Sequence, residues 1–226
     1  MTAFVVHPEG RGPFPVAVLF MDGVGYREQI KENARRFAAG GYFVVVPDLY
    51  HRMGEKLSFD MSQRDEMMAA ARSVTPDGAM ADTRAALAAA TSDLAAARGP
   101  MVTVGYCLGA RISLHAAAAM AGDVVAAAVI HPGALVTDHP DSPHHDLASV
   151  RGELYVAFAE NDRTATAENV EQFRNEARRV GVRGEVERLP ATHGFAMADL
   201  PVYDRAAAER HFERTLDLWG RNLRTY

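Results

Sequence analysis

The chain has 226 residues, a formal net charge of −5 at pH 7, 48% hydrophobic residues and 23% charged residues. This composition is typical of a soluble globular protein, and the acidic balance argues against nucleic acid or an anionic membrane as a partner. The single cysteine excludes an internal disulfide and a cysteine-rich metal site. The chain shows neither a signal-peptide pattern nor an apolar run of membrane-spanning length, so we expect one cytoplasmic domain over residues 1–226.

Short apolar runs alternate with amphipathic stretches, which predicts an α/β fold with a mostly parallel sheet and helices on both faces. In the first half of the chain, this pattern predicts strands at 16–21 and 42–46 and helices at 28–39 and 79–97. Residues 50–78 are polar and irregular. We expect them to form a loop or short helices over the site rather than a second domain.

The second half continues the pattern without an internal repeat, a low-complexity linker or a change in composition. It predicts, in order, a helix at about 108–121, a strand at 124–130, a loop at 131–150, a strand at 154–159, a helix at 166–180, a short strand at 185–189 and a helix at roughly 203–223.

Residues 105–109 read Gly-Tyr-Cys-Leu-Gly, between four residues suited to a buried strand and an alanine-rich helix. This is the Gly-x-nucleophile-x-Gly elbow of α/β-hydrolases, with cysteine where serine usually stands. Such a turn strains the nucleophile's backbone, and its glycines let strand and helix pass close together. The motif therefore predicts an α/β-hydrolase fold with Cys107 as nucleophile, the alternative being a small buried core residue.

A nucleophilic thiol needs a base and an orienting acid, which in α/β-hydrolases follow it in the order acid, then histidine. Asp162 follows the strand at 154–159, and His193 follows the short strand at 185–189 beside a glycine. We therefore predict that Cys107, His193 and Asp162 form a catalytic triad. Glu160 is a rival acid, and both carboxylates could instead cap the following helix.

The other histidines fit the triad order less well. His139, His144 and His145 fall in a loop rich in proline and aspartate and are most simply solvated, while His115 lies in the helix behind the elbow as a structural residue. Because none of these residues forms a clear ligand set, we expect no metal.

Hydrolysis through a covalent intermediate also needs an oxyanion hole made of two backbone N–H groups. One comes from the residue after the nucleophile, here Leu108. The loop at 21–25, Met-Asp-Gly-Val-Gly, follows the first confident strand and can supply the other, which we assign to Gly23. The loop lacks the spacing of a phosphate-binding loop or a dinucleotide fingerprint.

These pieces resemble the dienelactone hydrolase family. The resemblance rests on residues 105–109, on Val-Pro-Asp-Leu-Tyr at 46–50, on Ala-Glu-Asn-Asp at 159–162 and on His-Gly-Phe at 193–195. It implies a compact α/β-hydrolase fold, a Cys-His-Asp triad at Cys107, His193 and Asp162, and hydrolysis of lactones or esters without a cofactor.

The chain departs from the family pattern at two positions. Asp22 stands where the family usually has a glutamate that helps to activate the thiol, so activation through Asp22 depends on a carboxylate that is one methylene shorter. Met197 stands where the family has an arginine that binds the substrate carboxylate. Arg52, Arg64 and Arg72 are candidates to compensate, and dienelactone itself is not carried over as the substrate.

We therefore expect a cysteine-dependent hydrolase of small esters or lactones, acting as a monomer or small homo-oligomer. Tyr50, Phe195 and Met197 are expected to line a largely apolar substrate pocket. One alternative is a weak or inactive member of the same fold that only binds a small molecule. A redox role for the thiol is a further alternative, against which the lack of a second cysteine argues.

Overall fold

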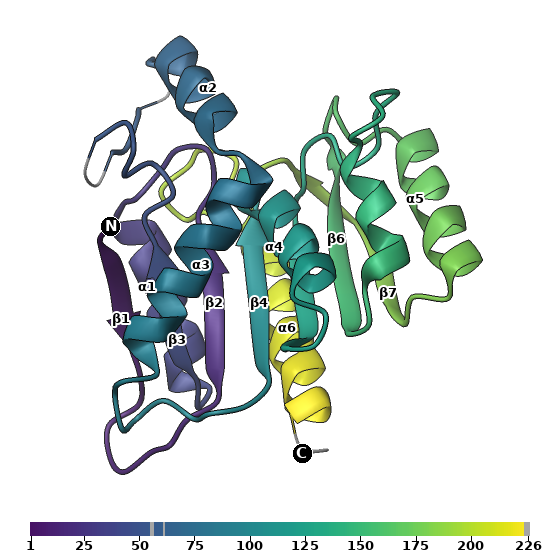
Figure 1. Ribbon diagram of the computed structural model, residues 1–226. Helices are drawn as coiled ribbons and strands as arrows, with labels where there is room; N and C mark the ends of the chain where they lie inside the picture. Colours follow the sequence, from purple (N-terminus) through teal and green to yellow (C-terminus); the bar gives the residue numbers. More distant parts are fainter. Residues whose placement is uncertain (55–56, 61, 224–226) are drawn as a thin grey trace.

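The computed structural model describes residues 1–54, 57–60 and 62–223. Its centre is a seven-stranded sheet in the order β1-β3-β2-β4-β5-β6-β7, shown in Figure 1. All neighbouring strands are parallel except β1 and β3, which are antiparallel. The strands are β1 Ala3–Val6, β2 Val16–Phe20, β3 Phe43–Pro47, β4 Met101–Tyr106, β5 Val124–Ile130, β6 Glu153–Asn161 and β7 Gly184–Thr192.

Helices cover both faces of this sheet (Figure 1). They are α1 Glu28–Ala39, α2 Arg64–Ser73, α3 Pro76–Ala90, α4 Leu108–Ala119, the 3-10 helix η1 Pro143–Ser149, α5 Ala167–Val180 and α6 Arg205–Leu223. On one face α1 packs against α6, where the ring of Phe37 lies 4.8 Å from the rings of both Phe212 and Trp219. The other face carries α3, α4, η1 and α5.

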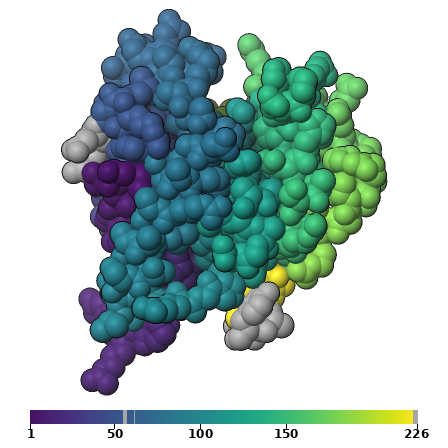
Figure 2. Space-filling view, in the orientation of Figure 1, coloured from purple at the N-terminus to yellow at the C-terminus, as the bar shows by residue number. Residues whose placement is uncertain are grey.

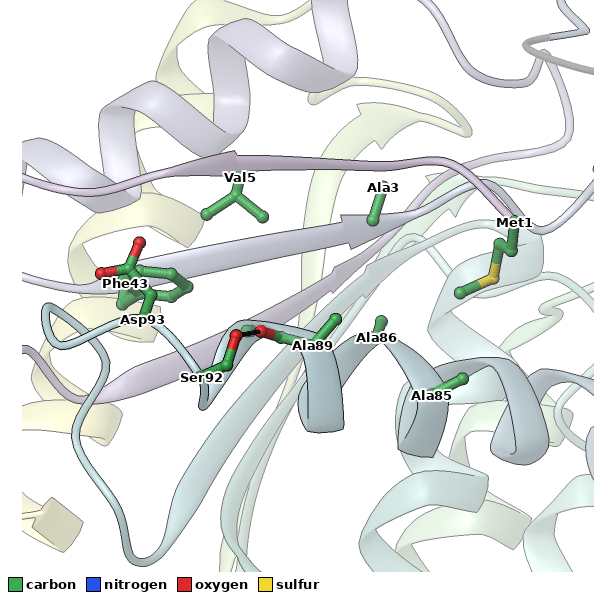
Figure 3. Close-up of a pocket in the computed structure, with 10 residues that line it drawn as sticks. Met1, Ala3, Val5, Phe43, Ala85, Ala86, Ala89, Ser92 and Asp93 are labelled. Carbon is green, nitrogen blue, oxygen red and sulfur yellow. Dashed lines mark hydrogen bonds between the residues drawn. The ribbon is translucent and has the colours of Figure 1, made fainter.

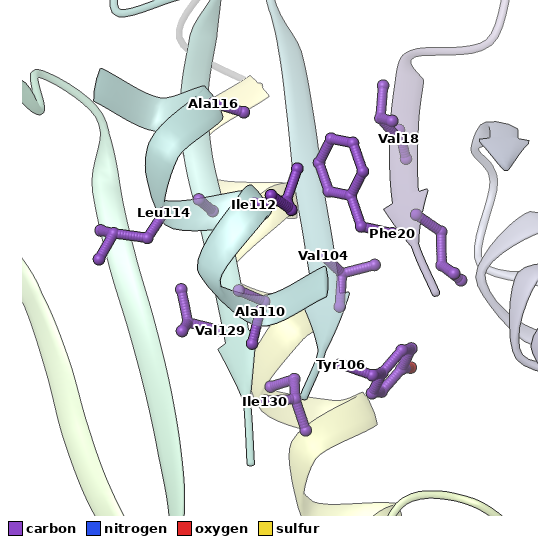
Figure 4. Close-up of a cluster of buried hydrophobic side chains, with 14 of the residues drawn as sticks. Val18, Phe20, Val104, Tyr106, Ala110, Ile112, Leu114, Ala116, Val129 and Ile130 are labelled. Atoms are coloured by element: carbon purple, nitrogen blue, oxygen red, sulfur yellow. The ribbon is translucent and has the colours of Figure 1, made fainter. Parts of the chain in front are cut away.

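The central strands are apolar along their whole length because both of their faces are covered. Every residue of β2, β3 and β4 is buried. Figure 4 shows α4 lying across this core, and Ala110 and Leu114 of the helix are buried. Alanines on the inner side of α4 let its backbone approach the sheet closely, which brings the start of the helix to the end of β4.

The predicted parallel sheet and the predicted strands and helices are confirmed, with shifted ends. The helix expected at 79–97 is α3, which begins earlier and ends at Ala90. It starts early because Thr75 caps it by accepting a hydrogen bond from Gly78 N, and Pro76 occupies its first turn.

Two elements were not predicted: the edge strand β1, and the 3-10 helix η1, which lies within the loop expected at 131–150. The edge strand β1 is short and half-exposed, so it lacks the continuous apolar run that marks the central strands. Residues 50–78 contain the helix α2, of which only Ala70 is buried, and α2 stands above the carboxyl ends of the strands in Figure 1. Within the described residues, no helix combines the length and the apolar character needed to cross a membrane.

Candidate active site

The elbow at the end of β4 has the geometry expected of a nucleophile turn. Cys107 is partly exposed, precedes the first residue of α4 and adopts φ 52° and ψ −108°, a conformation that non-glycine residues rarely adopt. A side chain on either flanking glycine would collide with backbone. A Cβ at Gly105 would lie 1.9 Å from Gly109 O, and one at Gly109 would lie 2.3 Å from Phe20 O.

The register of β6 and β7 explains why Asp162 and His193 meet. Asn161 and Thr192 are the last paired residues of these parallel strands, so the next residue of each chain segment leaves the sheet at the same place. The His193 Nδ1 atom lies 2.6 Å from Asp162 Oδ2. Thr164 holds the other carboxylate oxygen, donating to Oδ1 from its N–H and its hydroxyl at 2.8 Å each.

His193 is coupled to both of its predicted partners. Burial lowers the pKa of His193, but hydrogen bonds with Asp162 and Cys107 outweigh burial and raise the pKa to about 10. The rival acid Glu160 is exposed, and its backbone carbonyl accepts a hydrogen bond from Arg188. Neither carboxylate caps α5, because Thr166 does so in a capping box with Asn169.

In the loop after β2, the N–H groups of three successive residues already have acceptors. Val24 N and Gly25 N donate to Asp22 Oδ1, and Tyr26 N donates to Leu57 O. Gly23 N and Leu108 N have no acceptor among the described residues. The close contact of Gly109 with Phe20 O and Met21 O brings the first turn of α4 against the start of this loop.

Asp22 is bound by a residue that the sequence did not single out. Arg27 donates to Asp22 Oδ1 at 2.6 Å and to Oδ2 at 3.0 Å. Together with the N–H groups of Val24 and Gly25, these bonds occupy both oxygens of the carboxylate. In this structure the polar partners of Asp22 are thus Arg27 and its own loop, and its role in activating Cys107 stays a prediction.

The three residues predicted to line the substrate pocket, Tyr50, Phe195 and Met197, are each 0% exposed. The Tyr50 hydroxyl donates to Gly23 O at 2.9 Å, and the ring of Phe195 lies 5.1 Å from that of His131. Because none of the three presents surface to solvent here, their contact with substrate also stays a prediction.

The arginines considered for carboxylate binding are engaged or exposed. Arg52 donates to both oxygens of the buried Asp82, at 2.6 and 2.8 Å, and His51 Nε2 also contacts this carboxylate. Arg64 and Arg72 lie exposed on α2.

The remaining histidines divide into paired, exposed and buried residues. His115 Nδ1 bonds to Asp146 at 2.9 Å, while His139 and His145 are exposed. The expectation that His144 is solvated is wrong, because its ring is buried against Ser142 Oγ at 2.7 Å. Across the described parts of the chain, no group of three or more His, Cys, Asp or Glu side chains is placed to hold a metal.

His131 was missed, although it directly follows β5, between the strand of Cys107 and the strand before Asp162. Its position at the carboxyl end of a central strand is the signal that could have found it. Its ring is fully buried, and its backbone N–H donates to Ala157 O.

The surface above these residues is indented. Figure 2 shows the segment around α2 rising on one side of this end of the sheet and the loops after β5 and β6 rising on the other. A separate groove of about 580 Å³ lies between β1 and α3 (Figure 3) and is lined by side chains such as Val5, Phe43 and Ala89. None of the predicted site residues lines that groove, so the groove is separate from the candidate site at the carboxyl ends of the strands.

Comparison with known proteins agrees with this geometry. The model of the dienelactone hydrolase family matches residues 1–223. The chain belongs to the dienelactone hydrolase family. A Salmonella typhi protein provisionally named carboxymethylenebutenolidase is 29% identical over 225 residues, which cover 96% of this chain and 81% of that protein.

Solved structures of this family have the same fold. A provisionally named dienelactone hydrolase of Klebsiella pneumoniae subsp. pneumoniae has a TM-score of 0.86 at 21% identity, covering 96% of this chain and 92% of that chain. A dienelactone hydrolase-like promiscuous phosphotriesterase from metagenomic libraries has a TM-score of 0.80 at 22% identity, covering 97% and 92%. The α/β-hydrolase fold predicted from the elbow is therefore confirmed.

Proposed function

We propose that the chain hydrolyses small, uncharged carboxylic esters or lactones through an acyl intermediate on Cys107. The observation that carries this proposal is the arrangement around one imidazole. His193 lies 2.6 Å from Asp162, and interaction with Cys107 also raises the pKa of His193. A nucleophile, a base and an orienting acid in this order are the parts that acyl transfer needs.

In the first half of the reaction, the Cys107 thiolate attacks the carbonyl carbon and forms a C–S bond. The N-terminal end of α4 begins at Leu108 and favours negative charge on the sulfur. The carbonyl π electrons move onto oxygen, which gives a tetrahedral oxyanion. As that oxyanion collapses, the C–O bond to the leaving group breaks and His193 gives its proton to the departing oxygen. The product of this half is a thioester and a free alcohol, or a tethered alcohol for a lactone.

In the second half, neutral His193 takes a proton from water while the water oxygen attacks the thioester carbonyl. The C–S bond then breaks, which releases the carboxylic acid and restores the thiolate beside a protonated His193. Asp162 stays ionised throughout and holds the ring through Nδ1, so that Nε2 carries the transferred proton.

The oxyanion of both tetrahedral intermediates is assigned to the N–H groups of Gly23 and Leu108. The support is that neither N–H group has an acceptor among the described residues, whereas those of Val24, Gly25 and Tyr26 have one. Such donors stabilise charge that develops only in the transition state.

The preference for uncharged substrates rests on the charges near the site. Arg27 already binds carboxylates of the chain, Arg52 binds Asp82, and the position that carries an arginine in the family is Met197. A substrate carboxylate would therefore have to displace an internal ion pair to bind Arg27 or Arg52, and the other two candidates, Arg64 and Arg72, lie exposed on α2.

The test is hydrolysis of a small activated aryl acetate by wild type, Cys107→Ala and Asp162→Asn, with Glu160→Gln as the matched control for the acid. We expect phenol release by wild type and Glu160→Gln, none by Cys107→Ala, and a reduction of about a thousandfold or more in Asp162→Asn. Because Cys107 is the single cysteine, a hydroxylamine-sensitive acetyl adduct in a mass spectrum of quenched enzyme reports on this residue alone.

Equal turnover by wild type and Cys107→Ala would overturn the mechanism. Binding of small esters without turnover or an adduct, by folded wild-type protein, would favour the alternative of a non-hydrolytic binding protein. Comparing a neutral lactone with the same lactone bearing a carboxylate then tests the substrate class.

A further inference from the structure

Arg27 joins two loops that lie far apart in the sequence. Besides the two bonds to Asp22, its Nε donates to Asp199 Oδ2 at 2.6 Å and its Nη2 donates to Asp199 Oδ1 at 3.1 Å. The guanidinium is thus held by two carboxylates, each through both of its oxygens. The fork of a guanidinium fixes direction as well as distance, which a single lysine charge does not.

The two carboxylates belong to the two loops that the proposed reaction must keep in register. Asp22 opens the loop that carries Gly23, the assigned oxyanion donor. Asp199 lies in the segment after His193, which is tightly turned by hydrogen bonds from Met197 N to Gly194 O and from Leu200 N to Met197 O at 3.0 Å each. Through this compact segment, the position of Asp199 is tied to that of His193.

The Asp22 side of the bridge is buried, whereas its Asp199 side is exposed to solvent. The side chains of Arg27 and Asp22 are 11% and 4% exposed, and that of Asp199 is 38% exposed. Burial lowers the pKa of Arg27, but Asp22 and Asp199 together raise it above its ordinary value, so the guanidinium stays charged. Removing one partner of a buried ion pair such as Arg27 and Asp22 is strongly destabilising, whereas an exposed pair on a helix surface contributes little to stability.

Other contacts of the Gly23 loop come from a different direction. The Tyr50 hydroxyl donates to Gly23 O. Tyr26 N donates to Leu57 O, and Phe59 N donates to Val24 O. These partners belong to the segment after β3 and fix the loop to the body of the protein. The bond between Arg27 and Asp199 is the contact that relates the loop to the segment of His193.

We propose that Arg27, held between Asp22 and Asp199, is a positioning residue that fixes the Gly23 N–H relative to His193 and thereby sets the rate of acyl transfer. The inference rests on the proposed function of Cys107, His193 and Gly23. Arg27 touches no reacting atom in this scheme and acts through the loop. It is not needed to activate the thiol, because His193 is oriented independently by Asp162.

The experiment compares wild type with Asp199→Asn, which weakens one side of the bridge while Asp22 keeps its partner. Glu209→Gln is the matched control, since Glu209 of α6 binds Arg36 of α1 at 2.6 Å and belongs to neither of the two loops. Three experiments are made on each protein: steady-state kinetics with an aryl acetate for kcat and KM, the rate of alkylation of Cys107 by iodoacetamide, and amide hydrogen exchange in residues 22–26.

For Asp199→Asn we expect kcat to fall about tenfold, less than the hundredfold or more seen when an oxyanion donor is lost outright. KM and the alkylation rate should change less than about twofold, because binding and thiol activation do not use the bridge. Exchange in residues 22–26 should become faster, and Glu209→Gln should match wild type in every measurement.

An active wild type with unchanged kcat in Asp199→Asn overturns the inference while leaving the proposed function intact. An equal loss of kcat and alkylation rate also overturns it, since that would reflect general disturbance of the site. If wild type shows no turnover that depends on Cys107, the proposed function fails first and the positioning role fails with it. Arg27→Lys gives a second measurement on the other partner, and we expect it to lower kcat in the same way.

Discussion

His131 packs against His193, with ring centroids 5.3 Å apart and ring planes at 67°. The contact follows from the sheet, because Ile130 pairs with both Tyr106 and Ala157, which places His131 beside the end of β4 and the end of β6. Its backbone has φ 36°, and its ring also meets Phe195. The buried His131 ring therefore packs against the imidazole of His193.

We predict that His131→Phe leaves the free energy of unfolding within about 1.5 kcal/mol of wild type, as expected for a volume-conserving exchange. Within the described residues neither ring nitrogen of His131 has a partner, so phenylalanine removes two buried polar atoms and keeps the ring contacts. Burial and the nearby His193 and His211 lower the pKa of His131 well below its ordinary value, so no charge is lost. Urea unfolding measures the stability of the variant, and an esterase assay measures its activity.

His131→Ala is the contrasting variant. It removes the ring contacts with His193 and Phe195. We expect the free energy of unfolding to fall by about 2–5 kcal/mol and kcat to be reduced. If His131→Phe proved as stable as wild type but inactive, the imidazole nitrogens would have a chemical role that packing does not require.

The raised pKa of His193 predicts a dependence of stability on pH. Its pKa rises from 6.5 to about 10 on folding, so protonated His193 stabilises the folded state. This contribution is fully present below pH 6.5 and is lost as pH rises through about 10. Asp162→Asn removes one cause of the shift. The difference in unfolding free energy between wild type and this variant should therefore shrink as pH rises from about 6 to about 10.

Urea titrations at about pH 6, 8 and 10 measure that difference. Glu160→Gln is the control, because the exposed Glu160 side chain has no hydrogen bond to His193, and its difference from wild type should stay flat. A constant difference for Asp162→Asn across this range would show that the two residues are not coupled in solution.

Close packing at the elbow predicts that Gly109 tolerates no side chain. A Cβ there would lie 2.3 Å from Phe20 O and 2.4 Å from Met21 O, both of them backbone atoms that cannot move aside freely. We expect Gly109→Ala to cost about 3 kcal/mol or more in unfolding free energy and to abolish activity. Gly220→Ala in α6 is the control. Its Cβ would meet nothing within 4 Å, and we expect a gain of about 0.5–1 kcal/mol.

Local patterns in the sequence predicted much of this site. The elbow at 105–109 and the ends of the strands before Asp162 and His193 are recorded in continuous stretches of sequence, so periodicity and turn chemistry found them. The pairing of Asp162 with His193 then follows from the rule that parallel strands end at one edge.

The bridge from Arg27 to Asp199 could not be predicted in the same way. The two residues are 172 positions apart, and neither belongs to a sequence motif that relates it to the other. The burial of Tyr50, Phe195 and Met197 was also unexpected, because an apolar residue beside a motif fits a pocket wall and a core position equally well. Such contacts depend on how loops fold back over the sheet.

The hydroxyl of Tyr50 gives a final prediction about the oxyanion loop. Tyr50 is fully buried and donates to Gly23 O at 2.9 Å, while the N–H of the same peptide group, on Val24, donates to Asp22 Oδ1 at 3.1 Å. The peptide group between Gly23 and Val24 is therefore held by hydrogen bonds at both its C=O and its N–H. Tyr50→Phe keeps the ring and frees one end, so we expect kcat to fall about tenfold with little change in KM, as for loss of an interaction made in the transition state.

The matched control is Tyr155→Phe, since Tyr155 is also buried and its hydroxyl has no hydrogen-bond partner in the described part of the chain. Removing that hydroxyl should leave kcat unchanged and should not lower stability. Steady-state kinetics with an aryl acetate and urea unfolding of both variants separate the effect on the loop from general destabilisation. If Tyr50→Phe and Tyr155→Phe behaved alike, the bond from Tyr50 to Gly23 would have no part in holding the oxyanion donor in place.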